Sequence, residues 1–191
     1  MQNQKKITLS TYLTLFRLIG APVIIPYCIV QYSSYNNLTC NVAIAILFLF
    51  FGLTDFLDGF IARKYGQETQ IGAALDHIAD KFLVFSALIA LLAVGKISYW
   101  WVIALIGREF FMMSLREIAL EHNMKIKVSS WGKIKTAFHI MLIVWLIISP
   151  CYAVQQSARQ SIQILLLCAS VIISWGSALD YVSKLYFQFK K

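Results

Sequence analysis

The sequence is poor in charged residues. Lysine, arginine, aspartate and glutamate make up 14% of the 191 residues, whereas hydrophobic residues make up 59%. A soluble globular protein needs more polar side chains than this to cover its surface. The composition therefore argues against a soluble protein and predicts residence in a membrane.

Acidic residues are scarcer than basic ones: 9 stand against 17, and the net charge is +8. A basic chain can bind nucleic acid, but these basic residues are spread among apolar segments and form no single polar face. We therefore expect an anionic lipid leaflet and phosphate-bearing substrates as partners, and no nucleic acid.

Cysteine motifs are absent. The 4 cysteines show no C-x-x-C spacing and have no histidine pair nearby, which argues against a zinc site. Cys40 and Cys151 are expected near the outer face, where a disulfide is conceivable, although free thiols are favoured. A cleavable signal peptide is also not expected, because the first apolar run lacks the small-residue site that follows one.

The long apolar runs predict an all-α integral membrane protein, a bundle of six transmembrane helices in a single domain, residues 1–191. A helix needs about 20 residues to cross about 30 Å of hydrocarbon. Residues 7–12 are expected to begin a short N-terminal interfacial segment. The expected spans are 13–32, 39–63, 72–94, 97–120, 134–154 and 161–187.

Basic residues set the expected orientation, because loops rich in lysine and arginine stay in the cytoplasm. With six spans, only Lys96 and Arg159 lie on one side, and the other fifteen basic residues lie on the opposite side. We therefore expect an inner (cytoplasmic) membrane protein with both termini in the cytoplasm. Polar groups of five helices then share one depth, which predicts a single active site on the cytoplasmic side.

One stretch concentrates acidic residues within this apolar chain. Its first half places four residues three, four and seven positions apart, on one helix stripe: Asp55, Asp58, Gly59 and Ala62. Its second half repeats every fourth position: Gly72, Asp76 and Asp80. A helical hairpin turning within 64–70 would let the two stripes face each other and bring four carboxylates together.

Four neighbouring carboxylates repel one another unless cations share the site. Hard divalent ions such as Mg²⁺ and Mn²⁺ prefer oxygen ligands and often bridge to a substrate phosphate. Any one aspartate could instead cap a helix or pair with a basic residue. The small residues Gly59 and Ala62, however, leave room for a ligand against the backbone.

At every fixed position the stretch resembles the signature of the CDP-alcohol phosphotransferases, D-x2-D-G-x2-A-R-x8-G-x3-D-x3-D. These integral membrane enzymes join an alcohol to the phosphate of a CDP-linked donor and release CMP. The resemblance implies a homodimer whose four aspartates hold two Mg²⁺ or Mn²⁺ ions, with Asp80 also the catalytic base. The residues implied in binding the CDP donor are Asp55, Gly59, Ala62, Arg63, Gly72 and Thr14.

A second polar region follows the acidic stretch. Glu109 and Arg116 lie seven positions apart on nearly one helix face, and Arg108 is displaced by about 100°. Further on stands the run Gly132-Lys133-Ile134-Lys135-Thr136. Arginine binds phosphate through paired hydrogen bonds, and lysine adds a mobile charge. This region is therefore a candidate phosphate site.

These stretches, with Leu13–Arg17 and Pro22, resemble the phosphatidylglycerophosphate synthase branch of the family. The resemblance implies CDP-diacylglycerol as donor and sn-glycerol 3-phosphate as acceptor. One position departs from the branch, because His139 stands where a glutamine is usual; we interpret it as a polar residue facing the bundle. The residues implied in holding the acceptor phosphate are Arg108, Arg116, Lys133 and Lys135.

Two other interpretations stay open. A phosphatidylinositol-phosphate synthase of the same family would use the same acids with a larger phosphorylated acceptor. A divalent-cation carrier, which is not an enzyme, could use the acids as a transport site. Outside these regions, Asp180 and Lys184 lie four positions apart, and a simple ion pair is expected there.

Overall fold

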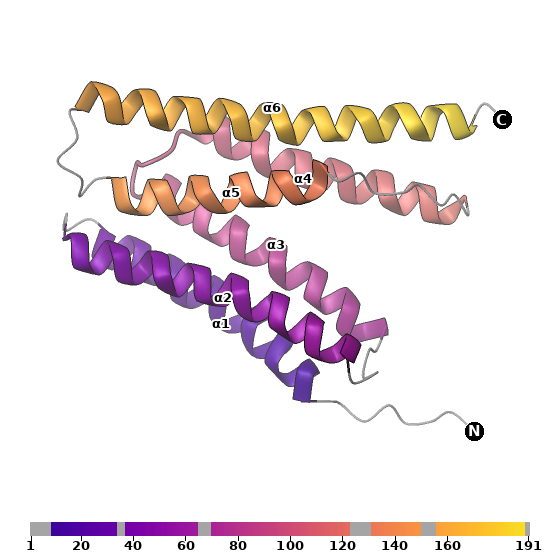
Figure 1. Cartoon of the computed structure of the whole chain (residues 1–191), viewed down its shortest axis with the longest axis horizontal. Coiled ribbons are helices and arrows are strands. Elements are labelled where there is room, and N and C mark those ends of the chain that lie inside the picture. Colours follow the sequence, from indigo (N-terminus) through magenta and orange to yellow (C-terminus); the bar gives the residue numbers. More distant parts are fainter. Residues whose placement is uncertain (1–8, 34–36, 65–69, 123–130, 150–155, 190–191) are drawn as a thin grey trace. The chain divides into compact units, whose positions relative to one another are not determined.

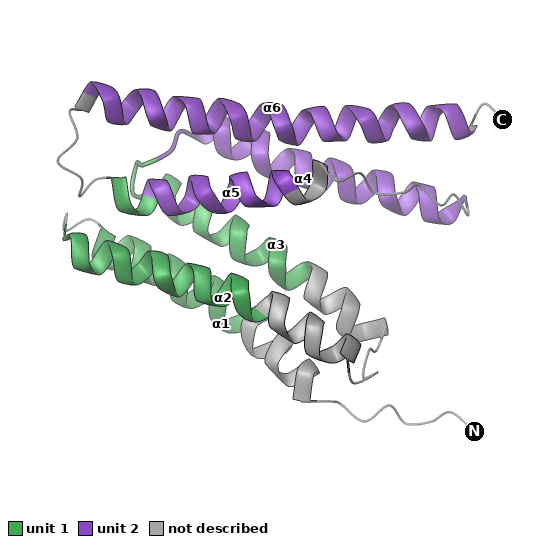
Figure 2. Ribbon diagram, viewed as in Figure 1, with its two compact units in different colours: residues 1–96, 147–152 green, residues 97–146, 153–191 purple. Residues whose placement is uncertain are grey.

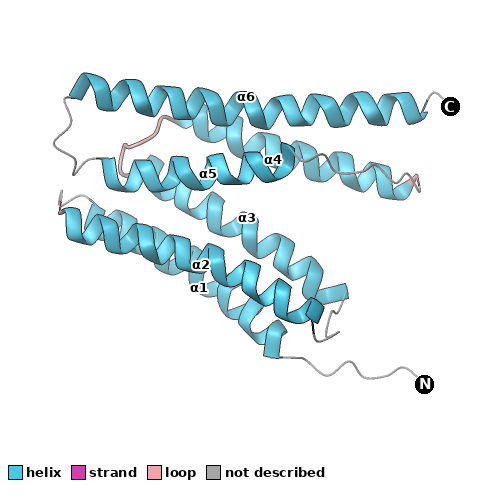
Figure 3. Cartoon of the chain, in the orientation of Figure 1, coloured by secondary structure: helices cyan, strands magenta, loops and turns pink. Residues whose placement is uncertain are grey.

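The computed structural model describes the backbone of residues 9–33, 37–64, 70–122, 131–149 and 156–189. Side chains are described over 18–33, 37–54, 78–122, 134–149 and 157–188. Within these ranges the chain is helical apart from short turns, and the described residues contain no strand (Figure 3). The all-α prediction is therefore confirmed for the part of the chain that is described.

In the part of the chain that the structure describes, six helices follow one another and match the six expected apolar runs (Figure 1). Each begins and ends within a few residues of its expected bounds, except at three ends. The helices are α1 (Leu9–Tyr32), α2 (Leu38–Lys64), α3 (Gln70–Ala93), α4 (Tyr99–Glu121), α5 (Trp131–Ile148) and α6 (Gln156–Phe189).

The three differing ends have simple physical reasons. α5 ends at Ile148, short of the expected 154, because Pro150 disfavours helical geometry at the residue before it. α6 begins earlier than expected, because its polar first turn, from Gln156, forms helix without adding hydrophobicity. Residues 9–12 belong to α1 and not to a separate interfacial helix, since neither proline nor glycine interrupts the chain there.

The chain divides into two compact units, residues 1–96 with 147–152 and residues 97–146 with 153–191 (Figure 2). Unit 1 contains α1, α2 and α3, and unit 2 contains α4, α6 and all but the end of α5. The single-domain assignment of residues 1–191 stays a prediction.

In unit 1, α1 packs against both α2 and α3. The apolar side chains Ile25, Ile29 and Phe48 are almost fully buried there. Gly95 lies two residues beyond the end of α3, and its φ of 72° is a left-handed conformation that glycine adopts without strain. The amides of Gly95 and Lys96 donate to carbonyls of the last turn at 3.0 and 2.9 Å, which caps the helix.

In unit 2, α4 packs against α6. Met112 of α4 is buried with Ala178 and Tyr181 of α6. The Trp175 indole Nε1 donates to the carbonyl of Ala104 at 3.2 Å. Apolar packing and a directed hydrogen bond therefore both hold α6 against α4.

The helices differ in whether they are long and apolar enough to cross a membrane. Among the residues with described side chains, only Ser157–Gln188 is both long and apolar enough to cross a membrane. Three shorter apolar stretches, Leu18–Tyr32, Leu38–Thr54 and Ile134–Ile148, lie in α1, α2 and α5. α6 also exposes Leu165, Ile172 and Leu179, spaced by seven residues, with 64–69% of each exposed. Such a stripe is unfavourable in water and suits lipid.

Candidate functional site

The acidic stretch is helical on both sides of its connection. α2 continues through Asp55 and Asp58 to Lys64, and α3 begins at Gln70 and continues through Asp80. The two helices contact each other within unit 1. The helix bounds that the hairpin prediction requires are therefore confirmed.

Most of the predicted donor and metal ligands have side chains outside the described residues. Asp80 is described, and it is half-buried on α3. Among the described side chains, no group of three His, Cys, Asp or Glu residues could hold a metal ion. Carboxylate oxygens on two contacting helices are nevertheless a donor set that fits Mg²⁺ or Mn²⁺. The predicted residues outside the described side chains are Thr14, Asp55, Asp58, Gly59, Ala62, Arg63, Gly72, Asp76 and Lys133.

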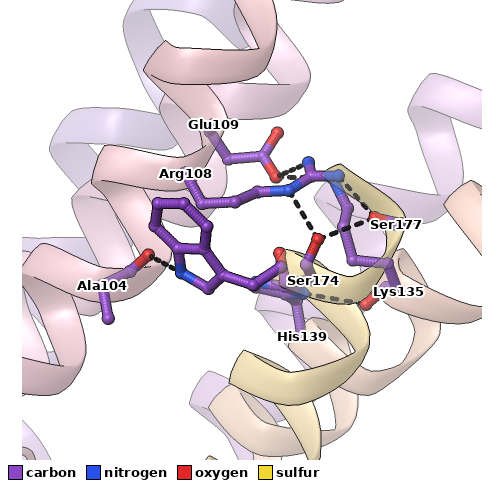
Figure 4. Close-up of polar contacts among 8 residues, drawn as sticks. Ala104, Arg108, Glu109, Lys135, His139, Ser174 and Ser177 are labelled. Carbon is purple, nitrogen blue, oxygen red and sulfur yellow. Dashed lines mark hydrogen bonds and ion pairs between the residues drawn. The ribbon is translucent and has the colours of Figure 1, made fainter. Parts of the chain in front are cut away.

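Arg108 lies inside unit 2, with only 3% of the residue exposed. Its Nε donates to the carbonyl of Ser174 at 2.9 Å, and its Nη2 donates to the hydroxyl of Ser177 at 2.6 Å (Figure 4). Its Nη1 donates to the Glu109 carboxylate at 2.7 Å. Contacts to α4 and α6 therefore hold the guanidinium in one orientation.

Glu109 joins two of the residues predicted to hold the acceptor phosphate. Its Oε1 accepts from Arg108 Nη1 and also from Lys135 Nζ, the latter at 2.5 Å. Lys135 lies on α5, so one carboxylate links α4 to α5 beside the contacts of Arg108 with α6. Two cations share one anion, and the excess positive charge suits a phosphate.

Arg116 lies two turns beyond Arg108 on α4 and is half-buried. It is near enough for its charge to act on Arg108. Its buried Nε has no hydrogen-bond partner among the described residues. A buried N–H without a partner is costly, so an acceptor oxygen there would stabilise the protein.

Sequence reasoning left three participants in this cluster without a role: Glu109, Ser174 and Ser177. Helical spacing placed Glu109 on nearly the same face as Arg116 but gave it no role. The serines had a signal, because Ser170, Ser174 and Ser177 recur at spacings of four and three in the apolar α6. Polar residues on one face of an apolar helix predict a buried polar contact.

The described side chains also test the predictions for the Asp180–Lys184 pair and for Cys40. Lys184 Nζ donates to Asp180 at 2.6 Å, which confirms the expected ion pair on the exposed face of α6. Cys40 is a free thiol, as favoured, and Cys151 lies outside the described residues.

His139 lies one helical turn beyond Lys135 on α5, with 5% of the residue exposed. Its Nδ1 lies 2.8 Å from the carbonyl oxygen of Lys135, and its buried Nε2 has no partner among the described residues. The prediction that His139 faces the bundle is therefore confirmed.

The sequence of this chain is similar to those of known proteins along most of its length. A sequence model described as CDP-alcohol phosphatidyltransferase matches residues 7–176. A protein of Escherichia coli strain K12 named CDP-diacylglycerol--glycerol-3-phosphate 3-phosphatidyltransferase is 35% identical over 183 residues, 92% of this chain and 93% of its own length. Proteins of the same name from Shigella sonnei and Shigella flexneri serotype 5b are 35% and 34% identical over the same shares of the chains.

Proposed function

This chain belongs to the CDP-alcohol phosphatidyltransferase family, and we propose that it transfers the phosphatidyl group of CDP-diacylglycerol to sn-glycerol 3-phosphate. The products are phosphatidylglycerophosphate and CMP, so the chain acts in phospholipid biosynthesis. Relatives that carry the name of this reaction match 92% of the chain, which supports the proposal over most of its length.

A family that acts on a lipid-linked donor is membrane-bound, and the chain is a membrane protein. We propose that the chain has six transmembrane spans and that both termini and the active site lie on the cytoplasmic side. The exposed apolar stripe of α6 and the bias of basic residues support this topology. A homodimer is the oligomeric state that the family resemblance favours.

Unit 1 carries the residues proposed for the donor. Asp55, Asp58, Asp76 and Asp80 would hold two Mg²⁺ or Mn²⁺ ions, which when bound would offset the negative charge of the donor pyrophosphate. Their positions on α2 and α3 support this assignment, because these helices contact each other. The nucleotide would be bound by Gly59, Ala62 and Arg63, with Gly72 and Thr14 as further candidates.

Asp80 is the proposed catalytic base. Its carboxylate would take the proton of the acceptor hydroxyl as the hydroxyl oxygen attacks the β-phosphorus of the donor. The new P–O bond forms there, and the bond between that phosphorus and the CMP oxygen breaks. Asp80 is half-buried on α3, so its carboxylate is not fully shielded from a substrate.

Unit 2 carries the residues proposed for the acceptor. Arg108 and Lys135 meet at Glu109, and Arg116 has a buried N–H without a described partner. Lys133, in the first turn of α5, completes the proposed set. The observation that carries the acceptor assignment is this buried excess of positive charge, which an uncharged alcohol would not need.

The test is an acceptor panel with the purified chain, CDP-diacylglycerol and Mn²⁺. We expect product with sn-glycerol 3-phosphate and none with inositol or serine, because only a phosphorylated acceptor neutralises the basic cluster. The lipid products would be identified by mass spectrometry. Product with inositol 1-phosphate alone would instead favour a phosphatidylinositol-phosphate synthase, whose larger acceptor the same cluster permits.

A further inference from the structure

His139 carries a buried polar atom that nothing in the described structure satisfies. The Nε2 of its ring has no hydrogen-bond partner among the described residues, and only 5% of the residue is exposed. Leaving such an atom unpaired costs stability unless another molecule supplies the hydrogen bond. The atom is therefore a candidate ligand contact.

The contact at the other ring nitrogen fixes which kind of partner Nε2 needs. Nδ1 lies 2.8 Å from the Lys135 carbonyl oxygen, which can only accept a hydrogen bond. Nδ1 must therefore carry a proton and donate it. In the neutral imidazole the second nitrogen then bears a lone pair, so Nε2 can only accept.

Burial of the ring favours this neutral form, because a charged ring would lose its hydration there, and the surrounding charges add to this. The charges of Lys135, Glu109 and Arg108 all act on His139. Two cations and one carboxylate already leave this cluster positive, so a third cation would be unfavourable there. A neutral ring presents an acceptor, which repels phosphate oxygens and attracts an O–H group.

We propose that His139 is a specificity-determining residue whose Nε2 accepts a hydrogen bond from the acceptor's non-reacting hydroxyl. This inference rests on the proposed function. Glycerol 3-phosphate carries one hydroxyl that attacks the donor and a second, on its middle carbon, that does not react. His139 binds this second hydroxyl, while the basic residues one turn away bind the phosphate.

The acceptor phosphate is expected to change the contacts of Lys135. Its ammonium is bound to Glu109 in this structure, one helical turn from His139. The acceptor phosphate, with its larger negative charge, competes with Glu109 for this ammonium.

The experiment compares glycerol 3-phosphate with 3-hydroxypropyl phosphate, which keeps the phosphate and the terminal hydroxyl but lacks the middle one. For the unmodified chain we expect kcat/KM to be higher with glycerol 3-phosphate by about tenfold, the effect of one hydrogen bond to a buried group. In His139→Phe this preference should fall to about 1. His139→Gln should keep it, because the amide oxygen can accept the same hydrogen bond.

A matched control is His122→Phe. Its Nδ1 also contacts a carbonyl one turn back, that of Ile118 at 3.0 Å, but the residue is exposed. This variant should keep the preference for glycerol 3-phosphate. Equal kcat/KM for both acceptors in the unmodified chain would overturn the assignment without any variant, as would a preference that persists in a folded His139→Phe. Absence of CMP release with either acceptor would instead contradict the proposed function itself.

Discussion

Replacing Asp80 with asparagine is expected to lower kcat by about 10²–10⁴-fold, the usual contribution of a general base. Asparagine keeps the size of the side chain but cannot take the proton of the attacking hydroxyl. Because Asp80 is also proposed to touch a metal ion, kcat should be measured over a wide range of Mn²⁺ concentration. We expect added Mn²⁺ not to restore kcat.

Asp180→Asn is the matched control for Asp80→Asn. Asp180 is an exposed carboxylate that pairs with Lys184 on the same face of α6. Its loss should leave kcat unchanged, because surface ion pairs contribute little. If high Mn²⁺ restores the Asp80→Asn variant to the unmodified rate, then Asp80 is a metal ligand and not the base.

Replacing Glu109 with alanine is expected to destabilise the protein by roughly 3–5 kcal/mol, the typical cost of leaving a buried charge without its partner. Arg108 and Lys135 would both lose the same carboxylate, at positions where the side chains are 4% and 13% exposed. The unfolding midpoint in detergent would measure the loss. The KM for glycerol 3-phosphate should also rise, since both cations lose a contact that helps to orient them.

A double variant separates the charge effect from simple loss of packing. Adding Lys135→Met to Glu109→Ala removes one of the two cations that lost this carboxylate, so part of the lost stability should return. The control is Lys184→Met, which breaks the exposed pair with Asp180 and should cost about 0.5 kcal/mol or less. Equal losses for Glu109→Ala and Lys184→Met would contradict the role given to Glu109.

The helices could be predicted closely, because each contains an apolar run longer than a β-strand usually is. The ends were less predictable, because they depend on local chemistry. Pro150 ends α5 earlier than the apolar run suggests, and the polar residues from Gln156 extend α6 beyond it. The division into two units could not be predicted, since it depends on which helices pack together and not on their hydrophobicity.

In the candidate site, helical spacing could likewise be predicted from the sequence, whereas contacts between side chains of different helices could not. Helical spacing placed Asp55 and Asp58 on one helix and Asp80 on the next, which the helix bounds bear out. It did not predict that Glu109 would bind both Arg108 and Lys135, because side-chain pairing between helices needs their packing. The contact of Arg108 with Ser174 involves a main-chain carbonyl, which no residue pattern encodes.

CMP release by the purified chain, with and without a chelator, tests the central claim most directly. With CDP-diacylglycerol, sn-glycerol 3-phosphate and Mn²⁺, we expect CMP and phosphatidylglycerophosphate in equal amounts. Omitting the acceptor or adding a chelator should stop both, and restored Mn²⁺ should return them, because the four aspartates are proposed to bind the donor through these ions. Transport of Mn²⁺ across a vesicle membrane without any CMP release would contradict the account and identify a cation carrier.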